Sequence, residues 1–268
     1  MVEPETPAER PLTHQEVLEF VAEHRRREAE DDPVVQERRR RYAEAAEGLL
    51  AELRGLIPDF EQTGFTLTDI GELDKLTFTR PDEETGEQKT RKVDYRAAVP
   101  VLLDWLPRVT YFPLAEDIVR VLSYGFAKKQ ARPVFLELFK NPPPVQDPKF
   151  ADEPERCREL LRSSLGSGLA RFAEPAVAEE YIQLALDSSL GRGRSAIVGS
   201  LPKTKDERVP EILVSLLGSS DVPVVRAATD ALRKLRHTPA RPHIEKLLDH
   251  EDELVRLDAK DALKRMKT

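Results

Sequence analysis

Three histidines near the C-terminus are the first residues to consider for metal chemistry. His237, His243 and His250 lie close to a run of acids that includes Asp249 and Asp252. A zinc site needs ligands that converge, for example two histidines one turn apart on a helix. The spacing here places no HExxH-type pair on one helix face. We therefore expect these residues to be polar turn residues and predict no metal site.

Serine and cysteine nucleophiles lack the sequence context that catalysis requires. None of the serines, such as Ser188 and Ser219, lies in a Gly-x-Ser-x-Gly turn between a strand and a helix. Cys157 is the only cysteine, so the chain forms no internal disulfide. Arg156 and Arg158 beside it could lower its pKa, but a free cysteine in a helical protein is more often packed in the core. We predict no enzyme activity, no catalytic residue and no cofactor.

The glycine-rich stretch GRGRSAIVG at 191–199 has the wrong context for a dinucleotide-binding loop. Such a loop follows a strand and needs the Gly-x-Gly-x-x-Gly spacing, whereas a helix precedes this stretch and its third glycine comes too late. Gly191 and Gly193 are expected to break the turn between two helices. An anion held by the two arginines of the stretch is the alternative.

The charge distribution argues against nucleic acid as a partner. The chain has a net charge of −7. Residues 176–268 hold 16 bases and 15 acids, and the remaining residues hold 26 bases and 34 acids. Neither part is the strongly basic surface that binding to phosphates requires. We interpret the run Arg38–Arg41 as a solvated helix face with a Glu37–Arg41 pair, with a patch for nucleic acid or an acidic partner as the alternative. We interpret the only tryptophan, Trp105, as a core residue rather than an interface anchor.

Helical periodicity dominates the chain. Residues 1–12 are expected to be a flexible tail without a signal peptide or membrane anchor, which favours the cytoplasm. Thr13 opens a first helix with a capping box, and Asp32-Pro33 begins a second that ends by Pro58. The segment LTFTRPDEETGEQKTRKV (76–93) alternates around a turn and predicts either a polar β-hairpin that leans on helices or a mobile loop. Helices follow from Tyr95 to the end, interrupted at 141–148 by the proline-rich NPPPVQDP.

The most informative pattern is self-similarity at a spacing of 31 residues. It predicts stacked helical hairpins, because one hairpin cannot bury both of its apolar stripes alone. Small residues on the second helix of each unit would let neighbouring backbones approach closely. The matching sets are Ile182, Leu213 and Ile244; Leu186, Leu217 and Leu248; Ile197, Ala228 and Ala259; and Leu201, Leu232 and Leu263.

The repeated segments SDVPVVRAATDAL (220–232) and EDELVRLDAKDAL (251–263) resemble the HEAT-like repeats of the phycobilisome-lyase type. The resemblance is good for 210–268, fair for 176–209, suggestive for 95–172 and absent for 1–90. It implies an all-α fold, a right-handed α-solenoid. The capping and alternation patterns described above add an N-terminal helical hairpin and a small β-hairpin or loop. In that family the second helices line a concave surface that holds a partner protein, and the arginine of Val-Arg often pairs with the acidic turn. Here that arginine is Arg256, with Asp252 or Glu253 as its expected partner. The outward positions that this implies for protein binding are Arg194, Arg226, Arg233, Lys260 and Lys264.

These observations divide the chain into a tail (1–12), an N-terminal helical region (13–93) and a repeat domain (94–268). The leading hypothesis is a non-catalytic scaffold or adaptor that binds another protein, and the composition is typical of a bacterial, high-GC genome. The alternative is a nucleic-acid-binding HEAT-like protein of the alkylpurine DNA glycosylase type. That alternative needs a basic groove with an aromatic side chain, and residues 176–268 hold only one aromatic, Tyr181. A chromophore lyase ranks last.

Overall fold

The computed structural model describes residues 32–57, 60, 65–82 and 85–266. The predicted tail and the helix that begins at Thr13 lie outside these residues. The α-helices are α2 (Pro33–Leu53), α4 (Val99–Trp105), α5 (Phe112–Leu122), α6 (Lys128–Lys140), α7 (Pro154–Arg171), α8 (Ala178–Leu186), α9 (Ser195–Ser200), α10 (Val209–Leu216), α11 (Val222–Leu235), α12 (Arg241–Glu245) and α13 (Glu253–Arg265), and the strands are β1 (Thr77–Pro81) and β2 (Gln88–Lys92).

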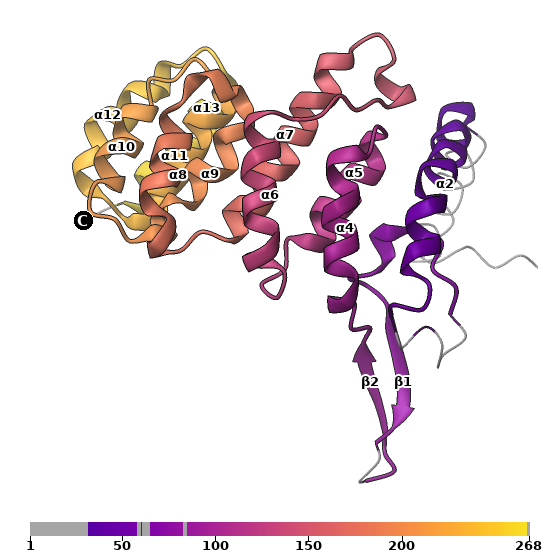
Figure 1. The fold of residues 1–268 in the computed structure, drawn as a ribbon. Helices are drawn as coiled ribbons and strands as arrows, with labels where there is room; N and C mark the ends of the chain where they lie inside the picture. The colour runs from indigo at the N-terminus through magenta and orange to yellow at the C-terminus, as the bar shows by residue number, and fades with distance from the viewer. Residues whose placement is uncertain (1–31, 58–59, 61–64, 83–84, 267–268) are drawn as a thin grey trace, which may run out of the picture.

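Consecutive helices pair as hairpins, and the hairpins stack into a curved solenoid (Figure 1). The pairs are α4 with α5, α6 with α7, α8 with α9, α10 with α11 and α12 with α13. The second helices form an inner row in which each packs on the next, from α5 through α7, α9 and α11 to α13. The predicted α-solenoid fold is confirmed, and none of the described helices has the length and apolarity needed to cross a membrane.

The 31-residue register corresponds to real packing. Ile182, Leu213 and Ile244 are buried on the first helices of three successive hairpins. Ile197, Ala228 and Ala259 are fully buried on the second helices. Leu186 departs most from the pattern, because it is 48% exposed where Leu217 is 6% exposed. Leu248 and Leu263 are half-buried. Leu186 is the last residue of α8, just before the 3-10 segment η6 (Ser188–Arg194). Its side chain is therefore exposed at the end of the helix.

Helix α2 begins where the sequence predicts. The side chain of Asp32 accepts a hydrogen bond from the Val34 amide at 2.8 Å, and Pro33 occupies the first helical position. The buried face of α2 packs on α4 and α5. Gly48 permits the close approach to α4, because a Cβ atom built there would lie 2.8 Å from the Trp105 ring. The hydrophobic core runs without interruption from Ala46 to Met266, and the boundary at residue 94 stays a prediction.

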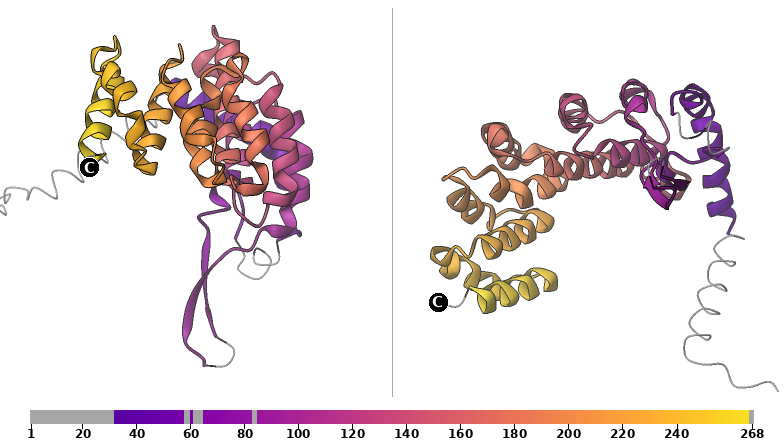
Figure 2. Two further views of the ribbon diagram at one scale, coloured as in Figure 1. Left: turned by 90° about the vertical axis from the view of Figure 1, so that its left-hand side faces the viewer. Right: turned by 90° about the horizontal axis from the view of Figure 1, so that it is seen from below.

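Strands β1 and β2 form the antiparallel hairpin that the alternation predicts. The expectation that it leans on helices is wrong for most of its length, because the ribbon projects away from the helical body and of the ten strand residues only Phe78, near its root, is packed against the core (Figures 1 and 2). Its root is held where the Val93 amide donates to the Leu76 carbonyl at 3.0 Å. Val93 is buried there and Leu76 packs against the core, so the core anchors only the base of the hairpin.

Candidate functional site

The inner row of helices forms the concave side of the solenoid (Figure 2, right). Helices α7, α9, α11 and α13 face the hollow of the arc, and α2 stands at the opposite end of the row (Figure 2). A partner lying in this hollow would touch residues from several repeats at once, which is how solenoids build extended binding surfaces. The side chains that line the hollow are therefore the candidates for a partner-binding site.

Two adjoining pockets form a groove at the N-terminal end of this row. The first, with a volume of about 450 Å³, lies between α2, the 3-10 helix η1 (Ile70–Glu72) and α5. The second, about 430 Å³, lies between α5 and α7. Asp117 lines both pockets and joins them. We call the combined depression the α2–α5–α7 groove. It is lined by Val35, Arg38, Arg39, Tyr42, Ala43, Thr68, Asp69, Glu72, Tyr111, Pro113, Glu116, Asp117, Val119, Arg120, Ser123, Ser164, Ser167, Gly168 and Arg171.

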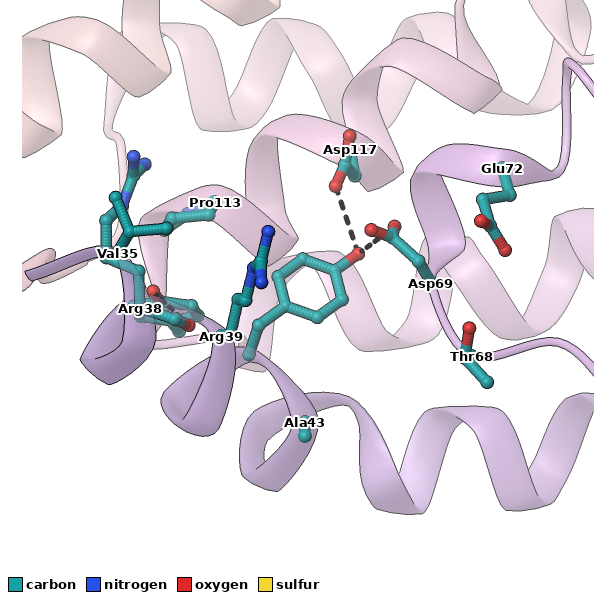
Figure 3. Close-up of a pocket in the computed structure, with 11 residues that line it drawn as sticks. Val35, Arg38, Arg39, Ala43, Thr68, Asp69, Glu72, Pro113 and Asp117 are labelled. Atoms are coloured by element: carbon teal, nitrogen blue, oxygen red, sulfur yellow. Dashed lines mark hydrogen bonds between the residues drawn. The ribbon is translucent and has the colours of Figure 1, made fainter. Parts of the chain in front are cut away.

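The hydroxyl of Tyr42 lies between the carboxylates of Asp69 and Asp117, which are labelled in Figure 3, in the first pocket. Its Oη lies 2.9 Å from Asp69 Oδ1 and 3.0 Å from Asp117 Oδ2, and it accepts a hydrogen bond from the Ile70 amide at 3.2 Å. Burial and the two nearby carboxylates raise the pKa of Tyr42, so the hydroxyl stays protonated. Since it has one proton, it donates to one carboxylate at a time. The three groups fix the position of η1 against α2 and α5.

A second polar network locks the segment after η1 to α5. Arg120 donates to Asp74 Oδ1 at 2.5 Å, to the Gly71 carbonyl at 2.7 Å and to Asp117 Oδ1 at 2.9 Å, and the Tyr124 hydroxyl donates to Asp74 Oδ2 at 2.7 Å. Burial raises the pKa of Asp74, but the hydrogen bonds from Tyr124 and Arg120 outweigh it and hold this pKa below its usual value. The wall of the groove is thus built from charges that the protein has already paired.

The groove presents both signs of charge to a ligand. Glu72 lines the first pocket and makes no ion pair with any described residue. Arg38 lies on the opposite side of the pocket from Glu72 (Figure 3), and its guanidinium pairs with the buried Asp147 carboxylate at 2.9 Å. Arg171 lines the far end of the second pocket and is exposed. The serines between them leave room for a bulky side chain. This arrangement suits an extended peptide segment that carries both charges.

Arg194 does not lie where sequence reasoning places it. Its side chain was expected to point outward from a second helix, but it is 3% exposed. The positive φ of 55° at Gly191 kinks the chain, so Arg194 belongs to η6 before α9 rather than to the helix itself. The guanidinium donates to the Ala185 carbonyl at 2.6 Å and to Asp221 Oδ2 at 3.0 Å. Arg194 therefore links two repeats and is not accessible to a partner protein. It is equally inaccessible to an anion bound at the glycine-rich stretch 191–199.

The other four predicted contact residues fall into two groups. Arg226 bonds Asp258 on the next inner helix at 2.6 Å, and Arg233 pairs with Asp230 and lies 3.8 Å from Asp261. Lys260 and Lys264 are exposed on α13 and pair with no carboxylate among the described residues. The two arginines thus bridge α11 to α13, whereas the two lysines are accessible. The structure does not bring all four residues together.

Arg256 does act within the chain, but it donates to the carbonyls of His250 and Glu251, each at 2.7 Å, rather than to Asp252 or Glu253. The pKa of Cys157 is raised, chiefly by burial and then by the charge of Asp147, so the flanking arginines do not activate the thiol. In the described part of the chain, no three His, Cys, Asp or Glu residues are grouped to hold a metal ion.

The Glu37–Arg41 pair is present with a 2.6 Å contact, and Glu37 also binds Arg40. These hydrogen bonds, first from Arg40 and then from Arg41, lower the pKa of Glu37 to about 2. Arg40 and Arg41 therefore lie on the solvated, internally paired helix face that the sequence predicts. Arg38 is the exception, because it reaches Asp147 in the proline-rich segment between α6 and α7.

Fold and groove together define the class of the protein, which is an α-solenoid with a grooved inner row. Residues 224–250 match the family model described as PBS lyase HEAT-like repeat, so the chain carries this repeat from near the start of α11 to the turn after α12. The match confirms the predicted family resemblance. No curated protein matches the chain. Among solved structures it is similar to a designed armadillo repeat protein in complex with the peptide (KR)4, at 15% identity and a TM-score of 0.39, over 88% of this chain and 96% of that chain.

Proposed function

We propose that the protein is a non-catalytic scaffold or adaptor that binds another protein along the inner side of its solenoid. The observation that supports this most is the α2–α5–α7 groove, in which two pockets of about 450 and 430 Å³ adjoin at Asp117. Ligand sites in helical proteins are commonly found between helices, and pockets of this size accept side chains of a bound segment. HEAT-like repeats supply the extended surface beyond it.

The chemistry of the groove indicates the kind of segment that fits. A basic side chain would meet Glu72 beside Asp69 and Asp117 in the first pocket, and an acidic one would meet Arg171 at the end of the second. Such charge-assisted contacts fix register and orientation more than they add affinity. Arg226, Arg233, Lys260 and Lys264 remain proposed contacts for the rest of the partner, while the buried Arg194 is withdrawn from that set.

The test is affinity capture of the tagged full chain, with and without Ser167→Arg, from a nuclease-treated lysate of the organism that makes the protein. Ser167 is an exposed groove residue whose hydroxyl bonds only the Ser163 carbonyl of its own helix, so arginine there fills the groove without disturbing the core. Ser215 is the matched control, because it is exposed on the outer helix α10 and bonds the Ile212 carbonyl in the same way.

We expect the wild type and Ser215→Arg to capture a partner protein whose binding survives moderate salt. Ser167→Arg should fail to capture it. Equal capture by all three proteins would contradict the groove as the binding site. Recovery of nucleic acid alone, lost steeply as salt rises, would support the alternative nucleic-acid-binding function.

A further inference from the structure

The projecting β-hairpin has two unequal edges. In the antiparallel ladder, the Asp82 amide donates to the Glu87 carbonyl at one end and the Val93 amide donates to the Leu76 carbonyl at the other. Because hydrogen-bonded and non-hydrogen-bonded pairs alternate in such a ladder, the peptide groups of Gln88, Thr90 and Lys92 point outward from β2. Those of Thr77 and Thr79 point outward from β1. The described residues contain no third strand to cover either edge.

Pro81 weakens only one of these edges. It stands at an outward position of β1 and has no amide hydrogen, so the outer edge of β1 lacks a donor there. The outer edge of β2 contains no proline, and all five of its residues are exposed. Exposed edges of this kind accept an extended segment of another chain by main-chain hydrogen bonding. The edge of β2 is therefore the better template.

The side chains of the two strands are basic, and the acids of the hairpin lie in the segment 82–87 that joins them. The ten strand residues hold four basic side chains and no acidic one, although the chain as a whole has a net charge of −7. The register places Arg80 opposite Lys89 and Phe78 opposite Arg91, so these four side chains share one face. The Arg80 guanidinium lies 5.2 Å from the centre of the Phe78 ring. Asp82 pairs with Lys89 at 2.7 Å and with Arg91 at 3.4 Å, so one carboxylate is shared by two of the three bases on this face. The face retains a positive excess.

This charge repels a second copy of the same edge and attracts an acidic strand. Lysines on an exposed strand are a known protection against edge-to-edge self-association. Opposite charges placed across two strands stabilise the pair, and like charges destabilise it. We propose that the outer edge of β2 binds an extended acidic segment of a partner protein as a third strand, with its carboxylates over Lys89 and Arg91.

Duplex DNA, which a two-stranded ribbon can enter through the major groove, fits less well. The tip of the hairpin would lead into the groove, and it carries Asp82 and Glu87. Their carboxylates would approach the phosphates, and the acidic body of the protein would follow. An acidic protein segment lying along the side of the ribbon avoids that repulsion.

Thr90→Pro in the full-length protein tests the edge directly. It removes the outward amide hydrogen at the centre of β2, and proline is tolerated at such edge positions. Thr79→Pro is the matched control, because Thr79 faces Thr90 across the ladder, its amide also points outward, and both variants lose the same 3.0 Å hydroxyl contact. The probe is a short synthetic peptide of alternating Glu and Val with neutral termini. A Lys-Val peptide and a DNA duplex serve as comparison ligands.

We expect the Glu-Val peptide to bind the wild type and Thr79→Pro about equally, and to bind Thr90→Pro about 3- to 10-fold more weakly, the effect of one hydrogen bond. Peptide binding should also slow amide exchange in the wild type at Gln88, Thr90 and Lys92 but not at Thr77 and Thr79. Three outcomes would overturn the proposal: equal weakening in both variants, no protection along β2, or tighter binding of the Lys-Val peptide or the DNA. The groove variant Ser167→Arg should bind the peptide normally, which separates this proposal from the scaffold function.

Discussion

Replacing Arg194 with methionine should destabilise the protein by about 2–4 kcal/mol. Its guanidinium is 3% exposed and donates to four acceptors: the Ala185 and Gly191 carbonyls, Ser219 Oγ and Asp221 Oδ2. Methionine fills most of the same space but leaves the Ala185 carbonyl and the Asp221 carboxylate without this donor. An unsatisfied buried acceptor costs about 1–3 kcal/mol. The Asp221 side chain is 27% exposed and can recruit water, which keeps the total below the upper end for a fully buried pair.

Arg226→Met provides the matched comparison. Arg226 has the same residue type and also bridges two repeats, through a 2.6 Å contact with Asp258, but both side chains of that pair are more than one-third exposed. Exposed ion pairs contribute about 0–1 kcal/mol. Urea unfolding followed by circular dichroism should therefore give a large loss of unfolding free energy for Arg194→Met and a small one for Arg226→Met. Equal losses would refute the conclusion that burial of the Arg194 guanidinium makes it a structural joint.

Three further perturbations test the packing. Leu232→Asp should unfold the C-terminal hairpins, because it buries an unpaired charge at a fully buried position. Its control, Leu235→Asp, lies at a 38% exposed position and should leave the thermal melt measured by circular dichroism nearly unchanged. Equal melts for the two variants would contradict the 31-residue register. Gly48→Ala should cost about 1–3 kcal/mol in urea unfolding because its Cβ meets the Trp105 ring, and an unchanged midpoint would contradict the close α2–α4 approach. Asp74→Asn should lower stability at neutral pH. Since the folded-state pKa of Asp74 is depressed, the wild-type advantage should be full above pH of about 4 and shrink as pH falls below it; a constant difference across unfolding curves at several pH values would exclude this linkage.

The helical stack could be predicted from the sequence because each repeat faces the same physical demand. Positions such as Leu213 and Ala228 must be apolar or small in every unit, so periodicity alone reveals them. The start of α2 can also be predicted from the sequence, since the Asp32 cap and Pro33 determine it through contacts within a few residues. The stacked repeats and the start of α2 are thus confirmed, whereas the helix predicted from Thr13 lies outside the described residues.

The prediction for Arg194 failed for a conformational reason. The second-helix register predicts an outward direction for Arg194, but the left-handed φ at Gly191 places it in the turn between α8 and α9, within one hairpin. The hairpin prediction failed in part for a related reason, because pairing between β1 and β2 is local whereas their position relative to the helices is not.

The α2–α5–α7 groove could not be predicted, because its groups come together only in the folded chain. The Tyr42 hydroxyl meets Asp69 and Asp117 across sequence separations of 27 and 75 residues. No spacing rule links such residues, and each alone is an ordinary polar residue on a helix or turn. The apolar pattern marked one face of α2 but gave no sign that Tyr42 would stand between two carboxylates.

Site-specific photo-crosslinking tests the scaffold function most directly. A benzoylphenylalanine placed at position 167 in the groove would be compared in cells with the same residue at position 215 on the outer row, where the native side chains are both exposed serines. The scaffold function predicts a discrete protein adduct from position 167 and none from position 215. The same adducts from both positions, or none from position 167, would contradict binding of a partner protein in the groove.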